Sequence, residues 1–208
     1  MSLVVASVLG YASGSVPFGL LLTRVTGAGD LRAIGSGNIG ATNVLRTGRK
    51  GLAAATLLLD GGKGAAAVLI ADHLPAGVFA SGQSGAEWLA LAGGAGAMVG
   101  HCFPVWLNFR GGKGVATMLG VALGLAWPIG LACLLAWAAL FKISKISSVG
   151  GMSAAIAAPI AALATGHAGM APMLAALAGL VLYQHRENIA RLRAGTEPRV
   201  GAKKDVDQ

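Results

Sequence analysis

The feature that most constrains this sequence is a series of long apolar segments separated by short polar ones. Of the 208 residues, 55% are hydrophobic and only 12% are charged. Soluble domains carry about 25% charged residues, and one of this size could not hide so much apolar surface from water. The apolar segments are near-continuous rather than alternating, which favours helices over a β-barrel. We therefore expect an all-α, polytopic membrane protein.

Glycine is unusually abundant, with 33 residues. Glycine costs a soluble helix about 1 kcal/mol relative to alanine, whereas small residues let membrane helices approach closely. The composition therefore predicts a compact bundle. Cys102 and Cys133 fit no metal or redox spacing, and we expect both to pack as small apolar residues. Residues 2–22 lack a basic region before them and a cleavage site after them, so they read as a retained span.

Hydropathy predicts about seven transmembrane helices, since each crossing needs roughly 20 apolar residues. One long apolar stretch, residues 113–143, contains Trp127-Pro128 near its middle and is expected to break there into two short spans. The other expected spans cover residues 2–23, 52–70, 86–99, 149–165 and 169–183. We expect a single transmembrane domain over residues 1–198 and a polar tail over residues 199–208.

The basic residues are distributed very unevenly between the two sides of this predicted bundle. Of the 16 Lys and Arg residues, all except Lys63 follow the first, third, fifth or seventh span. The loops that would face the other side contain no Lys or Arg; they lie around residues 71–86, 126–129 and 166–168. By the positive-inside rule, the charged side is cytoplasmic, the N-terminus is outside and the C-terminus is cytoplasmic.

Lys63 is the exception, because it falls inside the second span, three residues after Asp60. A charge within the membrane is costly and is usually paired. Residues three apart share a helix face, so Asp60 and Lys63 could neutralise each other. Two interpretations stay open: an internal ion pair that fixes helix packing, or a direct role in a functional site.

The first polar segment on the basic side is dense in glycines and small hydrogen-bonding residues. Such segments turn backbone N–H groups toward anions, especially beside a helix start, and Arg46 could grip phosphate with two hydrogen bonds. The alternative is a flexible linker, which would not need these side chains at such close spacing. The candidate ligands are Ser36, Gly37, Asn38, Thr42, Asn43 and Arg46.

The second polar segment places Gly111, Gly112, Lys113 and Gly114 just before an apolar helix, with Thr117 in its first turn. A glycine turn and a lysine at a helix N-terminus can hold phosphate. The pattern is not a Walker A motif, which needs Ser or Thr directly after the lysine. The alternative is a turn whose basic side chains extend to the membrane surface.

The third segment follows the last span and contains His185, Glu187 and Asn188 among several arginines. It could supply a base, a cation and a carboxylate. Alternatively, its basic residues complement a helix C-terminus and anchor to anionic lipid. Ser148, between the fifth and sixth spans, is by default a helix cap. Because all these segments share one side, we expect them to converge on an anion-binding basin open to lipid.

These motifs resemble those of the bacterial acyl-phosphate:glycerol-3-phosphate acyltransferase family (PlsY-type). The resemblance rests on residues 36–43 with Arg46, on residues 111–117 and on residues 185–188, and it extends over about residues 10–197. It implies transfer of an acyl chain from acyl phosphate to the 1-hydroxyl of glycerol 3-phosphate. The products would be 1-acyl-glycerol 3-phosphate (lysophosphatidic acid) and inorganic phosphate, in the first acylation step of phospholipid synthesis.

The resemblance also implies roles for the motif residues and a place in the cell. Ser36, Arg46, Lys113, His185 and Asn188 are the expected catalytic residues. The other motif residues would bind substrate or phosphate: Gly37, Asn38, Thr42, Asn43, Gly111, Gly112, Gly114, Thr117, Ser148 and Glu187. We expect a bacterial inner-membrane protein in contact with lipid, with its site on the cytoplasmic side. We also expect it to act as a monomer, with no metal, cofactor or nucleic acid.

Three alternative functions fit the sequence less well. A phosphate-ester transporter should carry polar groups at mid-membrane along a path through the protein, and only Asp60 and Lys63 qualify. A lipid-binding scaffold would not need so many hydrogen-bond donors. Acyltransferases that use thioesters carry a His-x4-Asp motif, and none of the four histidines has Asp five positions on.

Overall fold

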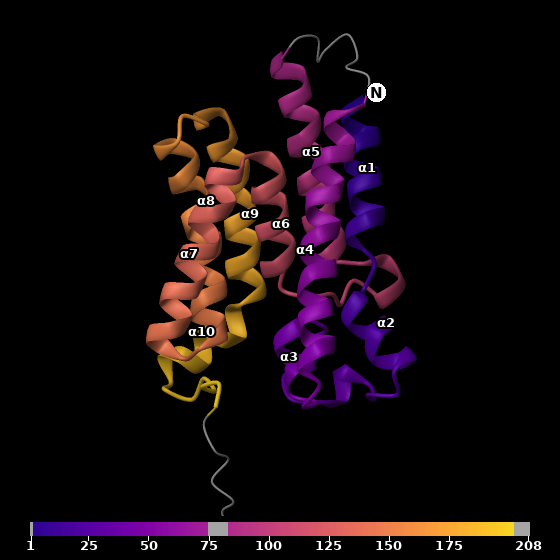
Figure 1. Ribbon diagram of the computed structural model, residues 1–208, viewed down its shortest axis with the longest axis vertical. Helices are drawn as coiled ribbons and strands as arrows, with labels where there is room; N and C mark the ends of the chain where they lie inside the picture. Colours follow the sequence, from indigo (N-terminus) through magenta and orange to yellow (C-terminus); the bar gives the residue numbers. More distant parts are fainter. Residues whose placement is uncertain (1, 75–82, 202–208) are drawn as a thin grey trace, which may run out of the picture.

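A computed structural model of the chain describes residues 2–74 and 83–201, and these residues form a bundle of helices without a strand (Figure 1). The expected all-α membrane architecture is therefore confirmed. The longer helices run side by side along the long axis of the molecule. They are α1 (Ser2–Gly14), α2 (Phe18–Val25), α4 (Lys50–Asp72), α5 (Gln83–Cys102), α6 (Val115–Leu125), α7 (Trp127–Ser144), α8 (Ser147–Ala164) and α9 (Ala171–Gln184).

Short helices lie mostly near the ends of the bundle and carry much of the polar sequence. They are η1 (Leu31–Ala33), α3 (Ala41–Leu45), η2 (Val105–Leu107), η3 (Ala168–Met170) and α10 (Arg186–Arg193). Helices α3 and α10 lie at the same end of the bundle, the lower end of Figure 1, and the junction between α7 and α8 is there too. The polar segments that follow the first, fifth and seventh expected spans therefore lie at the same end. Lys203 and Lys204 fall outside the described residues.

Each of the seven expected spans coincides with helical structure, but not all have the length of a membrane crossing. Among the described residues, five stretches are long and apolar enough to cross a membrane, and α9 with α10, bent by 61°, could make a sixth. Helix α6 has only 11 residues. The expected break at Trp127-Pro128 is confirmed, because α6 ends at Leu125 and α7 begins at Trp127. The division into residues 1–198 and a tail stays a prediction.

Glycine makes the close helix packing possible, as its abundance predicted. Where α1 crosses α5, a Cβ added to Gly10 or Gly14 would overlap the facing backbone, and so would one added to Gly96 or Gly100. The same holds where Gly120 of α6 meets α4. These glycines bring helix backbones into direct contact, which strengthens dispersion contacts in a membrane where no hydrophobic effect drives helices together. Both cysteines are buried in the core, as expected.

The first span is interrupted rather than continuous, which differs from the expected single helix over residues 2–23. Pro17 lacks an N–H, so regular helix stops at Gly14 and restarts at Phe18. In a membrane, the freed backbone carbonyls must find other donors. Trp106 Nε1 donates to the Ser15 carbonyl at 2.8 Å, and Lys63 Nζ donates to the Val16 carbonyl at 2.7 Å.

Lys63 also pairs with Asp60 at 2.7 Å, and both side chains are only 4% exposed. The expected neutralisation of one residue by the other is therefore confirmed. Ser13 Oγ donates to the Lys63 carbonyl at 3.3 Å, which adds a second link between α4 and the end of α1. Of the two open interpretations, this geometry supports the ion pair that fixes helix packing.

Candidate active site

The glycine-rich loop before α6 is held against the end of α5 by backbone hydrogen bonds. The N–H of Gly111 donates to the Cys102 carbonyl at 3.1 Å, and that of Gly112 donates to the His101 carbonyl at 3.0 Å. Gly114 has φ +81°, a left-handed conformation that glycine adopts without strain, and α6 begins at the next residue. Lys113 is thereby placed two residues before a helix N-terminus, as the sequence predicted.

The side chain of Lys113 reaches across to α10, where its ammonium donates a hydrogen bond to Asn188 Oδ1. Asn188 Nδ2 in turn donates to Glu197 Oε1 at 2.5 Å. The same carboxylate oxygen accepts from Ser148 Oγ at 2.6 Å, and Glu197 Oε2 accepts from Arg191 Nε at 2.7 Å. The loop, α8, α10 and the segment after α10 therefore meet in one polar cluster, which consists of Lys113, Ser148, Asn188, Arg191 and Glu197.

Two groups in this cluster have shifted pKa values. Burial lowers the pKa of Lys113, and repulsion from Arg191 adds to this, while Glu197 and Glu187 act in the opposite direction. Burial would raise the pKa of Glu197, but hydrogen bonds from Ser148, Asn188 and Arg191 outweigh it and leave that pKa below its ordinary value. Glu197 is therefore an ionised carboxylate at neutral pH and the electrostatic counterweight of the basic residues around it.

His185 lies at the junction of α9 and α10, beside this cluster, and is buried. Its Nδ1 is 2.8 Å from the Val181 carbonyl, so Nδ1 carries the proton and Nε2 is the acceptor. Nε2 faces α8, 3.6 Å from where a Cβ on Gly151 would stand. Burial lowers the pKa of His185 to about 4, although its bond to Val181 and the charge of Glu197 partly oppose the shift. The ring is therefore neutral at pH 7.

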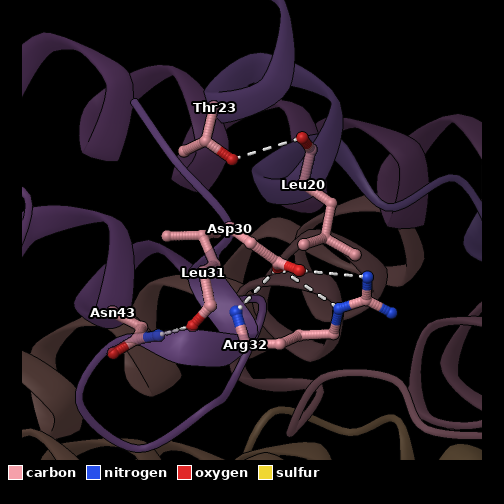
Figure 2. A network of polar contacts seen from close by, with 6 residues as sticks. All are labelled: Leu20, Thr23, Asp30, Leu31, Arg32 and Asn43. Carbon is pink, nitrogen blue, oxygen red and sulfur yellow. Dashed lines mark hydrogen bonds and ion pairs between the residues drawn. The ribbon is translucent and has the colours of Figure 1, made fainter. Parts of the chain in front are cut away.

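The first motif forms a network of its own around Asn43, which is buried; Figure 2 shows its bond to Leu31. Asn43 Nδ2 donates to the carbonyls of Leu31 at 2.8 Å and Ile34 at 3.0 Å. Its Oδ1 accepts from the Ser36 N–H and from Arg46 Nη1, each at 3.4 Å. Asn43 therefore shapes the loop and orients Arg46. Both the oxygen and the nitrogen of its amide are used within the protein, which leaves Asn43 little capacity to bind a substrate.

The turn that carries this motif is closed by a pairing at its start. Asp30 accepts from the backbone N–H of Arg32 at 3.0 Å and forms an ion pair with its guanidinium at 3.2 Å (Figure 2). Further on, Gly35 has φ +57°, and a Cβ there would overlap Arg46 and Asn43. The glycine therefore allows Arg46 to lie across the loop, with Ser36 beside it.

The first motif is joined to the polar cluster by Thr42, whose Oγ1 is 2.9 Å from Ser147 Oγ. Ser147 precedes Ser148, so Thr42 contacts α8 one residue away from the cluster. Ser36, Thr42 and Arg46 are exposed, whereas Gly37 and Asn38 are half-buried in the same loop. The structure thus places the predicted residues of the first motif at the end of the bundle where the cluster lies.

Two predicted site residues lie apart from the polar cluster, and the cap interpretation of Ser148 needs correction. Thr117 is fully buried in α6, where its methyl group packs against Gly64 of α4, so it lies inside the bundle rather than in the cluster. Glu187 is exposed and stays outside the cluster. Ser148 is not a side-chain cap of α8; it donates to Glu197 instead.

Glu197 closely follows the third motif, but the sequence assigns Glu187 and not Glu197 to the site; the structure places the Glu197 carboxylate in the cluster. A signal for it exists, since Gly195 has φ +71° directly after α10. Glycine at this place ends a helix and reverses the chain. The Thr196 N–H accordingly bonds back to the Arg191 carbonyl, and Glu197 returns to the helix.

No group of three or more His, Cys, Asp or Glu side chains among residues 2–74 and 83–201 is placed to hold a metal ion. The side chains that the structure gathers at this end of the bundle include cations and hydrogen-bond donors: Lys113 and Arg46, the hydroxyls of Ser36, Thr42 and Ser148, and the Asn188 amide. Such a set suits the binding of phosphate groups.

Known proteins with a similar sequence or structure agree with this description. The family model described as glycerol-3-phosphate acyltransferase matches residues 4–195. A glycerol-3-phosphate acyltransferase of Novosphingobium aromaticivorans is 66% identical over 197 residues, which cover 95% of this chain and 94% of that protein. One from Ruegeria pomeroyi is 53% identical over 203 residues, which cover 98% and 95%.

Two solved structures of a membrane acyltransferase are also similar to this chain. The crystal structure of PlsY (YgiH), an integral membrane glycerol 3-phosphate acyltransferase, in its glycerol 3-phosphate form matches with a TM-score of 0.86 and 34% identity, covering 97% of this chain and 96% of that one. Its lysophosphatidic acid form matches with a TM-score of 0.85 and 33% identity over the same shares. Fold and relatives together define an integral membrane acyltransferase. Within that class, the chain belongs to the glycerol-3-phosphate acyltransferase family.

Proposed function

We propose that this protein transfers an acyl group from acyl phosphate to the 1-hydroxyl of glycerol 3-phosphate. The products are 1-acyl-glycerol 3-phosphate and inorganic phosphate, and the reaction opens phospholipid synthesis. The observation that carries the proposal is the half-buried contact of Lys113 with Asn188, in one cluster with Ser148, at one end of an apolar bundle. Both substrates carry phosphate and one carries a long apolar chain, so they need a basic site next to lipid.

The two phosphate groups are divided between the two halves of the site. The loop of Gly111, Gly112 and Gly114 presents Lys113 to one phosphate, with Ser148 and Asn188 as further donors. Arg46 binds the other phosphate, with Ser36, Gly37, Asn38 and Thr42 lining the loop around it. Asn43 acts through Arg46 and Ser36, because its own amide is already bonded to the backbone of the loop and to Arg46.

The transfer itself needs placement and charge stabilisation more than new chemistry, because an acyl phosphate is already activated. The hydroxyl oxygen of glycerol 3-phosphate attacks the carbonyl carbon, the bond from that carbon to the phosphate oxygen breaks, and phosphate leaves. Lys113 and Arg46 balance the negative charge of the two phosphate groups, including the charge that develops on the departing phosphate. Neither a metal nor a nucleotide enters this scheme.

The hydroxyl proton can go to one of two acceptors. Nε2 of His185 is a free acceptor on a neutral ring, but the side chain is buried and Nε2 faces Gly151. The alternative is an oxygen of the acyl phosphate, which leaves as part of inorganic phosphate and takes the proton with it. The burial of His185 favours the phosphate oxygen as acceptor and gives His185 a positioning role at the hinge between α9 and α10.

We extend the proposal to the membrane topology. The protein crosses the bacterial inner membrane seven times, with the short helix α6 as one crossing and α10 lying at the surface. The basic end, with the site, faces the cytoplasm, where glycerol 3-phosphate is found, and the N-terminus is outside. The chain acts as a monomer in contact with membrane lipid, which supplies the acyl donor from the side.

The test is an assay of the purified protein in lipid vesicles or mild detergent. Acyl phosphate and glycerol 3-phosphate are supplied together and singly, and phosphate release and the acylated product are followed by colorimetry and mass spectrometry. Phosphate release that needs both substrates, with 1-acyl-glycerol 3-phosphate as product, supports the proposal. An acyl thioester in place of acyl phosphate is expected to give no product. Equal turnover of both donors would contradict the assigned donor, and transport without chemistry would indicate a carrier.

A further inference from the structure

His101, near the end of α5, lies between the buried Asp60–Lys63 ion pair and the phosphate-binding loop. Nδ1 of His101 is 3.8 Å from Oδ1 of Asp60, and both side chains are 4% exposed. Asp60 is held in place by its ion pair with Lys63 at 2.7 Å. Nδ1 of His101 has no hydrogen-bond partner among the described residues. The ring is therefore fixed by packing against this ion pair rather than by a hydrogen bond of its own.

The opposite edge of the same ring supports the glycine loop. A Cβ added to Gly112 would fall on Nε2 of His101, and it would stand only 2.9 Å from Cε1 and 3.0 Å from Cδ2. The backbone of Gly112 therefore rests directly on the imidazole. The Gly112 N–H also donates to the His101 carbonyl at 3.0 Å, so both the backbone and the side chain of His101 contact this residue.

Gly112 is held from a second direction by α9. Nε2 of Gln184 donates to the Gly112 carbonyl at 3.2 Å and to the Cys102 carbonyl at 3.4 Å. Gly112 thus has a defined position between the His101 ring and Gln184. The next residue is Lys113, whose ammonium bonds Asn188. The height of the loop over the imidazole consequently sets how far Lys113 reaches into the site.

We propose that His101 is a positioning residue for Lys113: the Asp60–Lys63 pair fixes its ring, and the ring sets the position of Gly112 and so of the phosphate-binding loop. This inference rests on the proposed function, since it assigns Lys113 to substrate phosphate. A displacement of about 1 Å at a substrate-positioning group can cost roughly 10²-fold in rate, so a support behind the loop is expected to affect catalysis strongly.

The test is a pair of size changes that compensate each other. Gly112→Ala places a methyl group on the ring and should lower kcat/KM for glycerol 3-phosphate by roughly 10²-fold, in line with a misplaced positioning group. His101→Ala removes the ring and should cost about tenfold by itself. In the double variant the new methyl group has room, so kcat/KM should rise at least about tenfold above that of Gly112→Ala alone, as expected for coupled neighbours.

Gly111→Ala is the matched control. A Cβ at Gly111 would meet the carbonyls of His101 and Cys102 and the Cδ of Pro104, none of which His101→Ala removes. Adding His101→Ala to Gly111→Ala should therefore restore no activity. His101→Gln, which keeps bulk beside Gly112, should also fail to restore Gly112→Ala. If His101→Ala does not yield folded protein, as judged by its melting temperature and size-exclusion profile, His101→Ser takes its place, because it also leaves room for the methyl group of Gly112→Ala.

A second cycle asks whether His101 acts through the lysine. In a Lys113→Ala background, His101→Ala should change kcat/KM by less than about threefold, because the group that it positions is gone. Full additivity of the two losses would overturn the proposal, as would a Gly112→Ala/His101→Ala protein that is no more active than Gly112→Ala. An inactive wild-type protein would instead contradict the proposed function, so the two failures are distinguishable.

Discussion

Lys113 and Asn188 are 75 positions apart in the chain and directly hydrogen-bonded, the ammonium of the first donating to Oδ1 of the second. The amide of Asn188 cannot turn away, because its Nδ2 donates to Glu197 at 2.5 Å. The loop before α6 and the helix after α9 are thereby joined at one point.

Removal of the Lys113 ammonium is expected to be the most damaging single change. Lys113→Ala should lower kcat/KM by about 10²–10³-fold, the typical effect of losing one electrostatic stabiliser of a transition state. The measurement is phosphate release at varied glycerol 3-phosphate and acyl phosphate. Arg110→Ala, in the same loop but exposed, is the control and should stay within about threefold. Near-normal turnover of Lys113→Ala would remove Lys113 from the site.

Glu197 is expected to matter more than Glu187, although only Glu187 lies within the third sequence motif. Glu197→Gln removes the charge that faces Arg191 and weakens the bonds from Ser148 and Asn188, which should cost about 1.5–3 kcal/mol for bonds to a charged group. We expect a lower melting temperature and at least tenfold less activity. Glu187→Gln should resemble the wild type; the reverse order of effects would contradict the assignment.

The pH dependence of stability should report His185. Its pKa is about 4 in the folded protein against 6.5 ordinarily, so only the unfolded chain takes up the proton as pH falls below 6.5. Stability is therefore complete above pH 6.5 and is lost between 6.5 and about 4, by at most about 1.4 kcal/mol for each pH unit. Melting temperatures measured across this window should fall less steeply in His185→Gln. Identical slopes would mean that the ring is not held neutral.

The same residue separates two routes for the proton. If an acyl phosphate oxygen accepts it, His185→Ala should lose activity mainly through misplacement of Asn188, and His185→Gln should recover part of the loss. If Nε2 of His185 is the base, both substitutions should cost about 10²–10⁴-fold, the usual contribution of a general base. We expect the smaller, recoverable loss, measured as kcat at saturating concentrations of both substrates.

The buried ion pair should respond differently to single and double substitution. Lys63→Met leaves Asp60 without its partner and removes the donor to the Val16 carbonyl, which should destabilise the protein by about 3 kcal/mol or more. Asp60→Asn together with Lys63→Met removes both charges, and only the loss of one hydrogen bond to the Val16 carbonyl, about 1 kcal/mol, should remain, because the Phe18 N–H still donates to that carbonyl at 3.2 Å. Thermal unfolding in detergent measures both. A double variant as unstable as Lys63→Met would contradict the pairing argument.

The proposed topology can be tested with cysteines placed at the two ends. Ala168 and Ala194 are exposed, at opposite ends of the bundle, while both native cysteines are buried. In intact cells, a thiol reagent that does not cross membranes should label Ala168→Cys from outside and leave Ala194→Cys unlabelled until the membrane is opened. Labelling in the opposite order would invert the assigned orientation.

The sequence predicted the helical segments well because hydropathy acts along the chain, residue by residue. The break at Trp127-Pro128 was readable from a proline at a helix start, whereas the break at Pro17 was not expected. That second break is tolerated only because Trp106 and Lys63, both far away in sequence, supply donors to it. Hydropathy does not indicate such partners, so a single continuous span was the natural expectation.

The sequence predicted several residues of the site but not the hydrogen bonds that join them. The sequence singles out Lys113, Ser148 and Asn188, yet nothing in their spacing says that a carboxylate outside the motifs joins two of the three. Glu197 reaches Ser148 and Asn188 only because α10 bends away from α9 and the chain reverses at Gly195. Thr117 follows the lysine in sequence, but the pitch of α6 turns it toward Gly64 and away from the site.

The break in the first span also constrains how the protein is made. Its Ser15 carbonyl is bonded by a residue 91 positions later and its Val16 carbonyl by one 47 positions later. Chains emerge from the ribosome N-terminus first, so the Ser15 carbonyl gains its Trp106 donor only after residue 106 has been made, whereas the Val16 carbonyl has the Phe18 N–H at 3.2 Å as a local donor. The break at Pro17 thus links the packing of the first span to a residue that follows the third.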